Sequence, residues 1–431
     1  MSVRAASLLL LSCLGLTLAV GCRSSGDGAA MPAGCGTDTG ISLPEGFCAT
    51  VFADGVGVAR HMAVDADGAV YVALERHGGD GGIVVLRDTD GDGHADQVQR
   101  FGDSGGTGIG LHDGWLYFAT TTEVLRYQLT PGEAVPGGLP QVVVEGFPQQ
   151  GEHSAKTITF DDSGHLYVNV GAPSNSCQQD DRQRESPGLS PCTLLDVHGG
   201  IWRFDADKPH QQFPQDGLRY ATGIRNAVAI TWGGSPESLY AVQMGRDQLS
   251  NNWPKLYTNQ QSADLPAEEF FQVHNGEDFG WPYCYYDQKL KKKVRAPEYG
   301  GDGKQQGDCA KYGQPIAAFP GHWAPEAVLF YSGRQFPLRY QGGAFVSFHG
   351  SWNRAPLPQA GYKVVFLPFE GGKPSAAYEI FADGFAGSKA PDSPGDAKYR
   401  PMGLAQGPDG TLYIGDTQTG RIWRVAYSPQ H

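Results

Sequence analysis

The stretch Arg400-Pro-Met-Gly-Leu-Ala-Gln-Gly-Pro-Asp-Gly-Thr-Leu-Tyr-Ile-Gly-Asp416 decides the fold, because the chain repeats its pattern. An apolar run leads to a turn that ends in Gly, and Leu-Tyr and a second apolar run follow. Asp-Gly supplies the positive φ that a tight hairpin turn needs, so each copy predicts two strands joined by a turn. Further copies occur at residues 60–72, 109–118 and 157–168, and looser ones follow Arg225 and Gln341.

These six copies predict an all-β fold, a six-bladed β-propeller of four-stranded antiparallel blades, because repeats of about 40 or more residues with this content are typical of propeller blades. The high content of 61 Gly and 29 Pro agrees with many turns and few helices. We place the propeller at residues 43–428. Residues 250–313 are poor in strand pattern, and we interpret them as an insertion that caps the site.

The first 21 residues have the pattern of an export signal, with Arg4, an apolar run over residues 8–20 and Gly21 before Cys22. They resemble a bacterial lipoprotein signal, which predicts cleavage before Cys22 and a lipid on its sulfur; secretion without an anchor is the alternative. Residues 22–42 then predict a flexible tether. We therefore expect an exported protein at the periplasmic face of the bacterial envelope, anchored to the outer membrane.

Six cysteines remain once Cys13 and Cys22 are assigned to the signal. An even number in an exported protein predicts disulfides, although the sequence leaves several connectivities open. None of the six has the C-x-x-C spacing of a zinc or redox motif. Pairing of near neighbours would join Cys35 to Cys48, Cys177 to Cys192, and Cys284 to Cys309.

The formal net charge of −13 becomes −14 when the signal is removed, because Arg4 is its only charge. An acidic surface argues against nucleic acid and anionic lipid as partners. Basic residues gathered at one place would therefore need an explanation.

The first residues of the innermost strands of a propeller line one mouth of its channel. Cations at such a mouth repel one another, so a group of them predicts a bound anion; for any single residue, a surface charge or a tie within a blade is the simpler interpretation. The residues expected at the mouth are Arg60, His153, Lys156, Arg225, Asn226, His349, Arg354 and Arg400.

Several stretches carry a resemblance to a known family. Among them are Gly151-Glu-His153, Gly223-Ile-Arg-Asn226, Met244-Gly-Arg-Asp247, Phe348-His-Gly-Ser-Trp-Asn-Arg354 and Arg400-Pro-Met-Gly403. The chain resembles the soluble aldose (glucose) and sorbosone dehydrogenases, six-bladed propellers that use pyrroloquinoline quinone (PQQ) and calcium, from about Leu43 to Val425. The near pairs of cysteines and the His-Gly-Ser-Trp-Asn-Arg stretch place it nearer to the sorbosone and pyranose dehydrogenase branch.

The resemblance implies an oxidoreductase that oxidises an aldose or related sugar and passes the electrons to an external protein or quinone. His153 matches the catalytic histidine, which takes the hydroxyl proton while hydride leaves carbon. The three carboxylates of PQQ call for Arg and Lys. The residues expected to bind PQQ are Arg60, Lys156, Arg225, Asn226, His349, Arg354 and Arg400.

The resemblance also places the calcium ion, which would polarise the quinone carbonyl. By position its ligands are the backbone carbonyls of Gly245 and Arg246, with Asp247 nearby; oxygen ligands suit this hard cation. A second calcium signal lies outside the channel, where Asp88, Asp90, Asp92 and Asp96 have the spacing of the first half of a calcium loop. An Asp- and Gly-rich hairpin end explains those four residues equally well.

Two local features have simple interpretations. The basic run Lys289–Lys293 predicts a solvated loop. The rings of Trp281, Tyr283, Tyr285 and Tyr286 could form a sugar-stacking wall, although packing between blades is favoured.

Two other functions stay open. The chain could be a non-catalytic propeller that binds protein or glycan, or a calcium-dependent hydrolase of the lactonase type. A lactonase would line its channel with acidic and amide side chains, whereas the innermost strands here are expected to begin with His, Arg and Lys.

Overall fold

The computed structural model describes residues 39–75, 82–387 and 389–429. The predicted signal, most of the tether, Cys22 and Cys35 lie outside these ranges. Within them no helix is long and apolar enough to cross a membrane.

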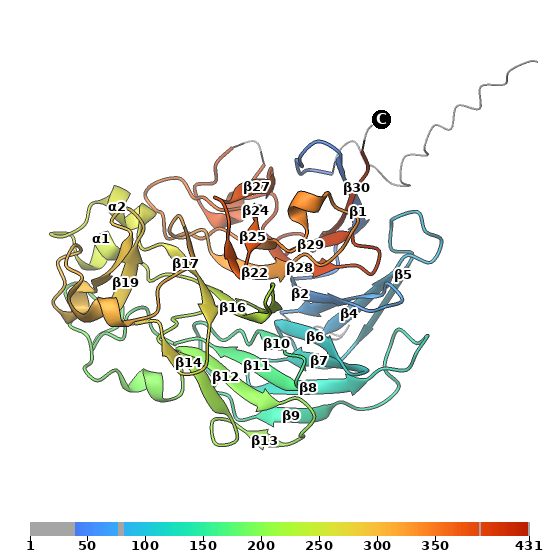
Figure 1. Cartoon of the computed structure of the whole chain (residues 1–431), viewed down its shortest axis with the longest axis horizontal. Helices are drawn as coiled ribbons and strands as arrows, with labels where there is room; N and C mark the ends of the chain where they lie inside the picture. Colours follow the sequence, from blue (N-terminus) through green and yellow to red (C-terminus); the bar gives the residue numbers. More distant parts are fainter. Residues whose placement is uncertain (1–38, 76–81, 388, 430–431) are drawn as a thin grey trace, which may run out of the picture. The chain divides into compact units, whose positions relative to one another are not determined.

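Six mainly antiparallel sheets follow one another along the chain, and Figure 1 shows them arranged around a ring. The six-bladed β-propeller predicted from the repeats is thus confirmed. The innermost strands are β2 (Ala59–Val64), β6 (Gly108–His112), β10 (Ile158–Phe160), β15 (Ala229–Gly233), β22 (Pro325–Phe330) and β28 (Pro401–Gln406). The second strands are β3 (Val70–Leu74), β7 (Trp115–Ala119), β11 (His165–Val170), β16 (Ser238–Gln243), β23 (Ala344–Phe348) and β29 (Leu412–Asp416).

Third and outer strands complete the blades. The third strands are β4 (Ile83–Arg87), β8 (Glu123–Gln128), β12 (Gly200–Asp205), β17 (Glu268–Val273), β24 (Lys363–Leu367) and β30 (Ile422–Tyr427). The outer strands are β5 (Gln97–Phe101), β9 (Gln141–Glu145), β14 (Leu218–Thr222), β21 (Ala317–Phe319), β27 (Glu379–Ala382) and, in the last blade, β1 (Phe47–Ala53). Two blades carry a fifth short strand in parallel pairing: β13 (Gln211–Gln212) beside β9, and β18 (Glu277–Asp278) beside β14.

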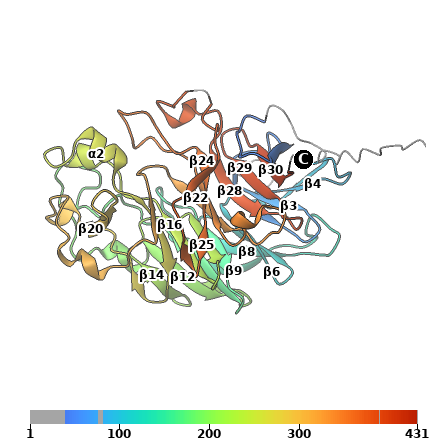
Figure 2. The ribbon, with the colours of Figure 1, turned by 45° about the horizontal axis from the view of Figure 1, so that its top comes forward.

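The ring closes through its first strand, because β1 pairs antiparallel with β30 and places Phe47 opposite Tyr427. This pairing joins the two ends of the propeller and covers the edge of the last blade, which would otherwise expose unpaired backbone groups. Figure 2 shows β30 beside β29 and β28 in this blade.

The hairpin turns show why the repeated phrase specifies the blades. Its turn glycines all have positive φ, from 77° at Gly342 to 85° at Gly68. The aspartate that precedes some of these glycines also caps the turn: Asp161 accepts hydrogen bonds from the backbone N–H groups of Ser163 (2.9 Å) and His165 (3.0 Å). The sequence pattern thus encodes both the backbone conformation and its hydrogen bonds.

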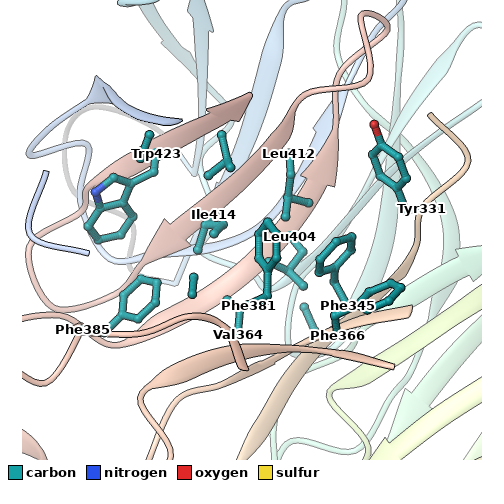
Figure 3. Close-up of a cluster of buried hydrophobic side chains, with 14 of the residues drawn as sticks. Tyr331, Phe345, Val364, Phe366, Phe381, Phe385, Leu404, Leu412, Ile414 and Trp423 are labelled. Atoms are coloured by element: carbon teal, nitrogen blue, oxygen red, sulfur yellow. The ribbon is translucent and has the colours of Figure 1, made fainter. Parts of the chain in front are cut away.

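Aromatic side chains pack neighbouring blades together, as Figure 3 shows for the fifth and sixth. Phe345 and Phe366 from β23 and β24 lie in the same buried cluster as Leu412 and Trp423 from β29 and β30. Each such side chain stabilises the fold by about 1.5–3 kcal/mol when fully buried.

The interpretation of residues 250–313 as one insertion was wrong in one respect. Strand β17, the third strand of the fourth blade, lies inside this range. Its sequence does not alternate, because five of its six residues are buried, including Glu268 and Glu269 at its start. The insertion is therefore in two parts, one with α1 (Leu249–Asn252) and α2 (Asn259–Asp264), the other with the β19 (Cys284–Asp287) and β20 (Lys292–Arg295) hairpin. We call these two parts the cap (left side of Figure 1).

The basic run Lys289–Lys293 is a solvated loop, as predicted, over residues 289–291, which are exposed, but not at Lys293. It turns from β19 into β20, and the Lys293 side chain is fully buried. Its ammonium lies 2.8 Å from a carboxylate oxygen of Glu269 and donates to the carbonyl of Phe279 at 2.5 Å. A buried partner on another strand is not visible in local sequence.

Disulfides join Cys177 to Cys192 and Cys284 to Cys309, as near-neighbour pairing predicts. Cys48 is also disulfide-bonded. Its predicted partner, Cys35, lies outside the described residues. The first bridge closes a loop beside the cap, and the second closes a segment within the cap.

Candidate active site at the channel mouth

Residues from all six innermost strands line a small cavity of about 130 Å³ in the channel. Each blade begins with its innermost strand, so the residues just before these strands gather at one mouth of the channel. Most of the predicted residues, together with Glu326, form two groups there, which we name by one member each. The Glu326 side comprises Arg60, Glu326, His349 and Arg400, and the His153 side comprises His153, Arg225, Asn226 and Asp247.

The Glu326 side centres on a buried carboxylate that sequence reasoning missed. Glu326 is the second residue of β22, and its carboxylate lies 3.4 Å from Arg60 Nη2 and 3.9 Å from His349 Nδ1. Burial raises the pKa of Glu326, and the nearby Arg60 and Arg400 oppose that rise. The innermost strand of the fifth blade was not located in the sequence, because a long loop separates β22 from the turn glycine Gly342.

The cations on the Glu326 side keep unused donor capacity. Arg60 Nε is buried and has no hydrogen-bond partner among the described residues. Arg400 donates only to backbone carbonyls with its side chain, to His349 at 3.2 Å and to Gly350 at 2.6 Å. Burial, together with Arg400 and Arg60, holds the pKa of His349 well below its usual range, so this ring is neutral. Besides Glu326, the half-exposed Glu75 lies 3.9 Å from Arg60 Nη1, so Arg60 faces two carboxylates.

On the His153 side, the catalytic candidate has a fixed orientation. Its Nδ1 lies 2.5 Å from the carbonyl oxygen of Ala172, so in the neutral ring Nδ1 carries the hydrogen and Nε2 holds a lone pair. His153 has a positive φ of 52°, and the Gln150 amide holds this backbone by donating to three carbonyls, that of His153 among them at 3.0 Å. Burial and Arg225 lower the pKa of His153 to about 4, so the ring is neutral near pH 7.

Arg225 is held by a dense set of contacts. Its Nη2 lies 2.6 Å from Asp247 Oδ2, and its Nη1 donates to the carbonyl of Gly245 at 2.8 Å. Asp247 also faces Arg182 at 3.3 Å and His322 at 3.6 Å. The cations hold the pKa of Asp247 far below its usual range against the effect of burial. Arg225 Nε is buried with no partner in the described part of the chain.

A relay of buried polar groups connects the cap to Arg225. Lys293 pairs with Glu269, and the other carboxylate oxygen of Glu269 accepts from Gln243 Nε2 at 2.8 Å. Gln243 Oε1 in turn accepts from the backbone N–H of Arg225 at 3.0 Å. We call this chain of contacts the Lys293 relay. It makes the cap part of the framework that positions Arg225.

Asn226, the last member of the His153 side, and Lys156 both lie near the innermost strands. Asn226 accepts from the Asn169 amide at 3.3 Å, and a side chain at Gly171 would collide with both Asn226 Oδ1 and His153 Cβ at 2.7 Å. Lys156 is fully buried, donates to the Ser154 carbonyl at 2.8 Å, and has no carboxylate within 4.0 Å in the described ranges. Burial lowers the pKa of Lys156 to about 8.

The structure does not bring Arg354 into either group. Its guanidinium donates to the Ala263 carbonyl at 2.5 Å and lies 3.6 Å from Asp264, so it ties its own loop to the end of α2. Mutual repulsion among the basic residues at the mouth is also smaller than their number suggests. Glu326 neutralises Arg60, and Asp247 neutralises Arg225. Only some of the basic residues predicted at the mouth therefore lack a counter-charge from the described part of the protein.

The calcium candidates differ in what they can offer. The Gly245 carbonyl already accepts from Arg225, and the Asp247 carboxylate is surrounded by three basic side chains, which makes it a poor ligand. The Arg246 guanidinium is bound to Glu298 at 2.5 Å and points its charge into the cap. Its backbone carbonyl is the ligand that fits the prediction best.

The second calcium motif forms an exposed hairpin end between β4 and β5. Carboxylate oxygens of Asp88, Asp90 and Asp96 lie within 4.8 Å of one another. Asp92 instead accepts from the His94 N–H at 2.8 Å, and Asp88 caps the turn by accepting from Gly91 and Gly93. Both interpretations of the motif, turn and metal loop, are compatible with this geometry.

The comparisons with known proteins identify the family. The TrAA12-like family model matches residues 41–428, and the chain therefore belongs to this family. It is 26% identical over 258 residues to a pyrroloquinoline quinone-dependent pyranose dehydrogenase of Coprinopsis cinerea, covering 50% of this chain and 33% of that protein. An uncharacterized protein of Borreliella burgdorferi is 29% identical over 209 residues, 48% of each chain. The chain spans a half or less of these curated relatives.

Solved structures confirm the fold. The holo PQQ domain of the Coprinopsis cinerea pyranose dehydrogenase superposes with a TM-score of 0.71 at 19% identity, over 90% of this chain and 97% of that one. A calcium structure of a Trichoderma reesei family AA12 enzyme gives 0.72 at 18% identity, over 90% and 97%. The PQQ-bound aldose sugar dehydrogenase of Streptomyces coelicolor gives 0.54 at 16%, over 89% and 99%. The resemblance predicted from sequence is thus confirmed at the level of family and fold.

Proposed function

We propose that this protein is a PQQ- and calcium-dependent dehydrogenase that oxidises an aldose or related sugar at the channel mouth. The observation that carries this proposal is the pairing of a neutral, oriented His153 with arginines that have buried, unused donors. Its relatives include a PQQ-dependent pyranose dehydrogenase, which supports the same chemistry here.

The residues present fit the cofactor. A planar quinone with three carboxylates would satisfy the buried Nε atoms of Arg60 and Arg225, and would supply a counter-charge to Lys156 and Arg400. The carbonyl oxygen of Arg246 would hold calcium, together with the second lone pair of the Gly245 carbonyl oxygen, whose first accepts from Arg225. When bound, PQQ accepts the hydride that leaves the sugar carbon.

The chain's own residues handle the proton. His153 Nε2 is the acceptor for the sugar hydroxyl, because Nδ1 is committed to Ala172. Arg225 lies close enough to lower the pKa of His153, and Asp247 holds its guanidinium in place. Among the described residues, Glu326, Asp247 and Glu152 at the mouth are each paired with arginine, which differs from the free acidic and amide side chains of a lactonase-type metal site.

Titration of PQQ into the full chain with calcium tests the proposal. We expect one-to-one binding at micromolar PQQ and bleaching of the oxidised-quinone absorbance by at least one sugar of a panel. Absence of binding under these conditions would favour a non-catalytic binding module.

We also propose that Cys22 carries the lipid anchor and that an external protein or quinone takes the electrons. The chain has no C-x-x-C-H haem motif, which supports an external acceptor. Labelling with a radioactive fatty acid should mark the wild-type protein and fail to mark Cys22→Ala. Equal labelling of both would rule out the anchor at this residue.

A further inference from the structure

A cleft of about 550 Å³ lies between the loop closed by Cys177–Cys192 and the cap segment closed by Cys284–Cys309. This volume is in the range of small-ligand sites. No residue of the Glu326 side or the His153 side lines it. Three tyrosines do, together with Arg295, Asp308 and Lys311: Tyr283, Tyr299 and Tyr312.

The cleft is preformed, because contacts cross between its two walls. The backbone N–H of Cys192 donates to the Tyr283 hydroxyl at 2.9 Å, and that of Gly188 donates to the Glu298 carbonyl at 2.9 Å. The Tyr299 hydroxyl donates to the carbonyl of Ser176 at 3.3 Å. A Cβ atom on Gly188 would lie 2.3 Å from the Tyr299 ring, so this close approach requires glycine. A rigid site loses little free energy to ordering when a ligand binds.

The lining combines aromatic rings with charges of both signs. Tyr283 and Tyr299 meet edge to face at 4.8 Å, and all three tyrosines stay partly exposed. Arg295 Nη2 lies 3.5 Å from Asp308 Oδ2, while Lys311 Nζ lies 5.0 Å from the centre of the Tyr312 ring. An anionic ligand would meet Asp308, and a cationic one would meet Arg295 and Lys311. A neutral polyhydroxylated ligand can stack on rings and bond charged groups of either sign.

We propose that this cleft is an accessory carbohydrate-binding site that takes a neutral sugar chain outside the channel mouth. Trp281 and Tyr285 are buried, so packing explains those two rings of the aromatic stretch, whereas Tyr283 faces the cleft. The proposal goes beyond sugar oxidation, because binding here needs neither PQQ nor His153.

Calorimetric titration of the full chain with cellotetraose, without PQQ, tests this site. We expect saturable binding that weakens roughly fivefold or more in Tyr312→Ala. The Asp308 side chain is 83% exposed, so Asp308→Ala should leave the fold intact. We expect this variant to weaken cellotetraose binding roughly twofold or more. The matched control is Lys304→Ala, an exposed residue of the same insertion that does not line the cleft.

His153→Ala should bind cellotetraose like the wild type, which separates this site from the mouth. The proposal is overturned by an absence of saturable binding. It is equally overturned if both cleft variants bind like Lys304→Ala, or if His153→Ala alone loses binding. Failure of PQQ to bind would not affect any of these outcomes.

Discussion

The two sides of the channel mouth use similar residues in different ways. On the His153 side, Arg225 contacts Asp247 at 2.6 Å, and Arg182, His322 and the Lys293 relay surround this pair. On the Glu326 side, the contacts to the shared carboxylate are 3.4–3.9 Å long. The dense network suits a group that must keep its position during proton transfer. The looser network suits a place where ligand carboxylates join or replace an internal one.

The largest expected effect concerns the base. His153→Ala should lower turnover roughly 10²-fold or more, the usual contribution of a general base. Steady-state kinetics with saturating PQQ and calcium measure this. Near wild-type turnover in the variant would place the base elsewhere, with His349 the next candidate.

The second prediction concerns the Glu326 carboxylate and tests whether the Glu326 side shares its arginines with the ligand. Glu326→Gln leaves the charge of buried Arg60 without its nearest partner, which should destabilise the free protein by about 3 kcal/mol. In the variant, the carboxylates of bound PQQ would neutralise the charge of Arg60. PQQ should therefore raise the unfolding temperature more in the variant than in the wild type. Thermal unfolding with and without PQQ compares the two. An equal rise in both proteins would show that Glu326 does not share its arginines with the ligand.

The third prediction is that the Lys293 relay positions Arg225 on the His153 side. Gln243→Met preserves volume but removes the acceptor of the Arg225 backbone N–H, and a small displacement of a positioned group can cost roughly tenfold in turnover. Affinity for PQQ should change less than turnover. The matched control is Gln260→Met, whose side chain bonds Asp264 on the surface of α2. If turnover in Gln243→Met equals that of the control, the relay has only a structural role.

The smallest expected effect depends on pH. Because the pKa of Lys156 is lowered to about 8, its charge is present below that pH and is lost as pH rises through it. PQQ affinity should therefore weaken by a few-fold above about pH 8, where Lys156→Met should show no such change. An alkaline loss of affinity that persists in Lys156→Met would assign the titration to another group.

The fold was predictable from sequence because Asp-Gly turns and flanking strands are local features that repeat. The basic residues just before the innermost strands could be found for the same reason. Glu326 and Lys293 could not, since Glu326 pairs with Arg60 of the first blade, Lys293 pairs with Glu269 on a separate strand, and their own surroundings look ordinary. A buried charge in a hydrophobic strand can be recognised only when the position of its counter-charge in the fold is known. For the same reason strand β17, which begins with the buried Glu268 and Glu269, was not predicted from its sequence.

The central claim is that the His153 side performs the chemistry while the Glu326 side anchors the cofactor. PQQ dissociation constants and turnover, measured on the same preparations of His153→Ala and Arg400→Ala, test it most directly. We predict that His153→Ala keeps its PQQ affinity and loses turnover. Arg400→Ala should bind PQQ roughly tenfold more weakly or worse, the loss expected for a charge-assisted contact, and keep its turnover when PQQ is saturating. Equal losses of affinity and turnover in both variants would contradict the division.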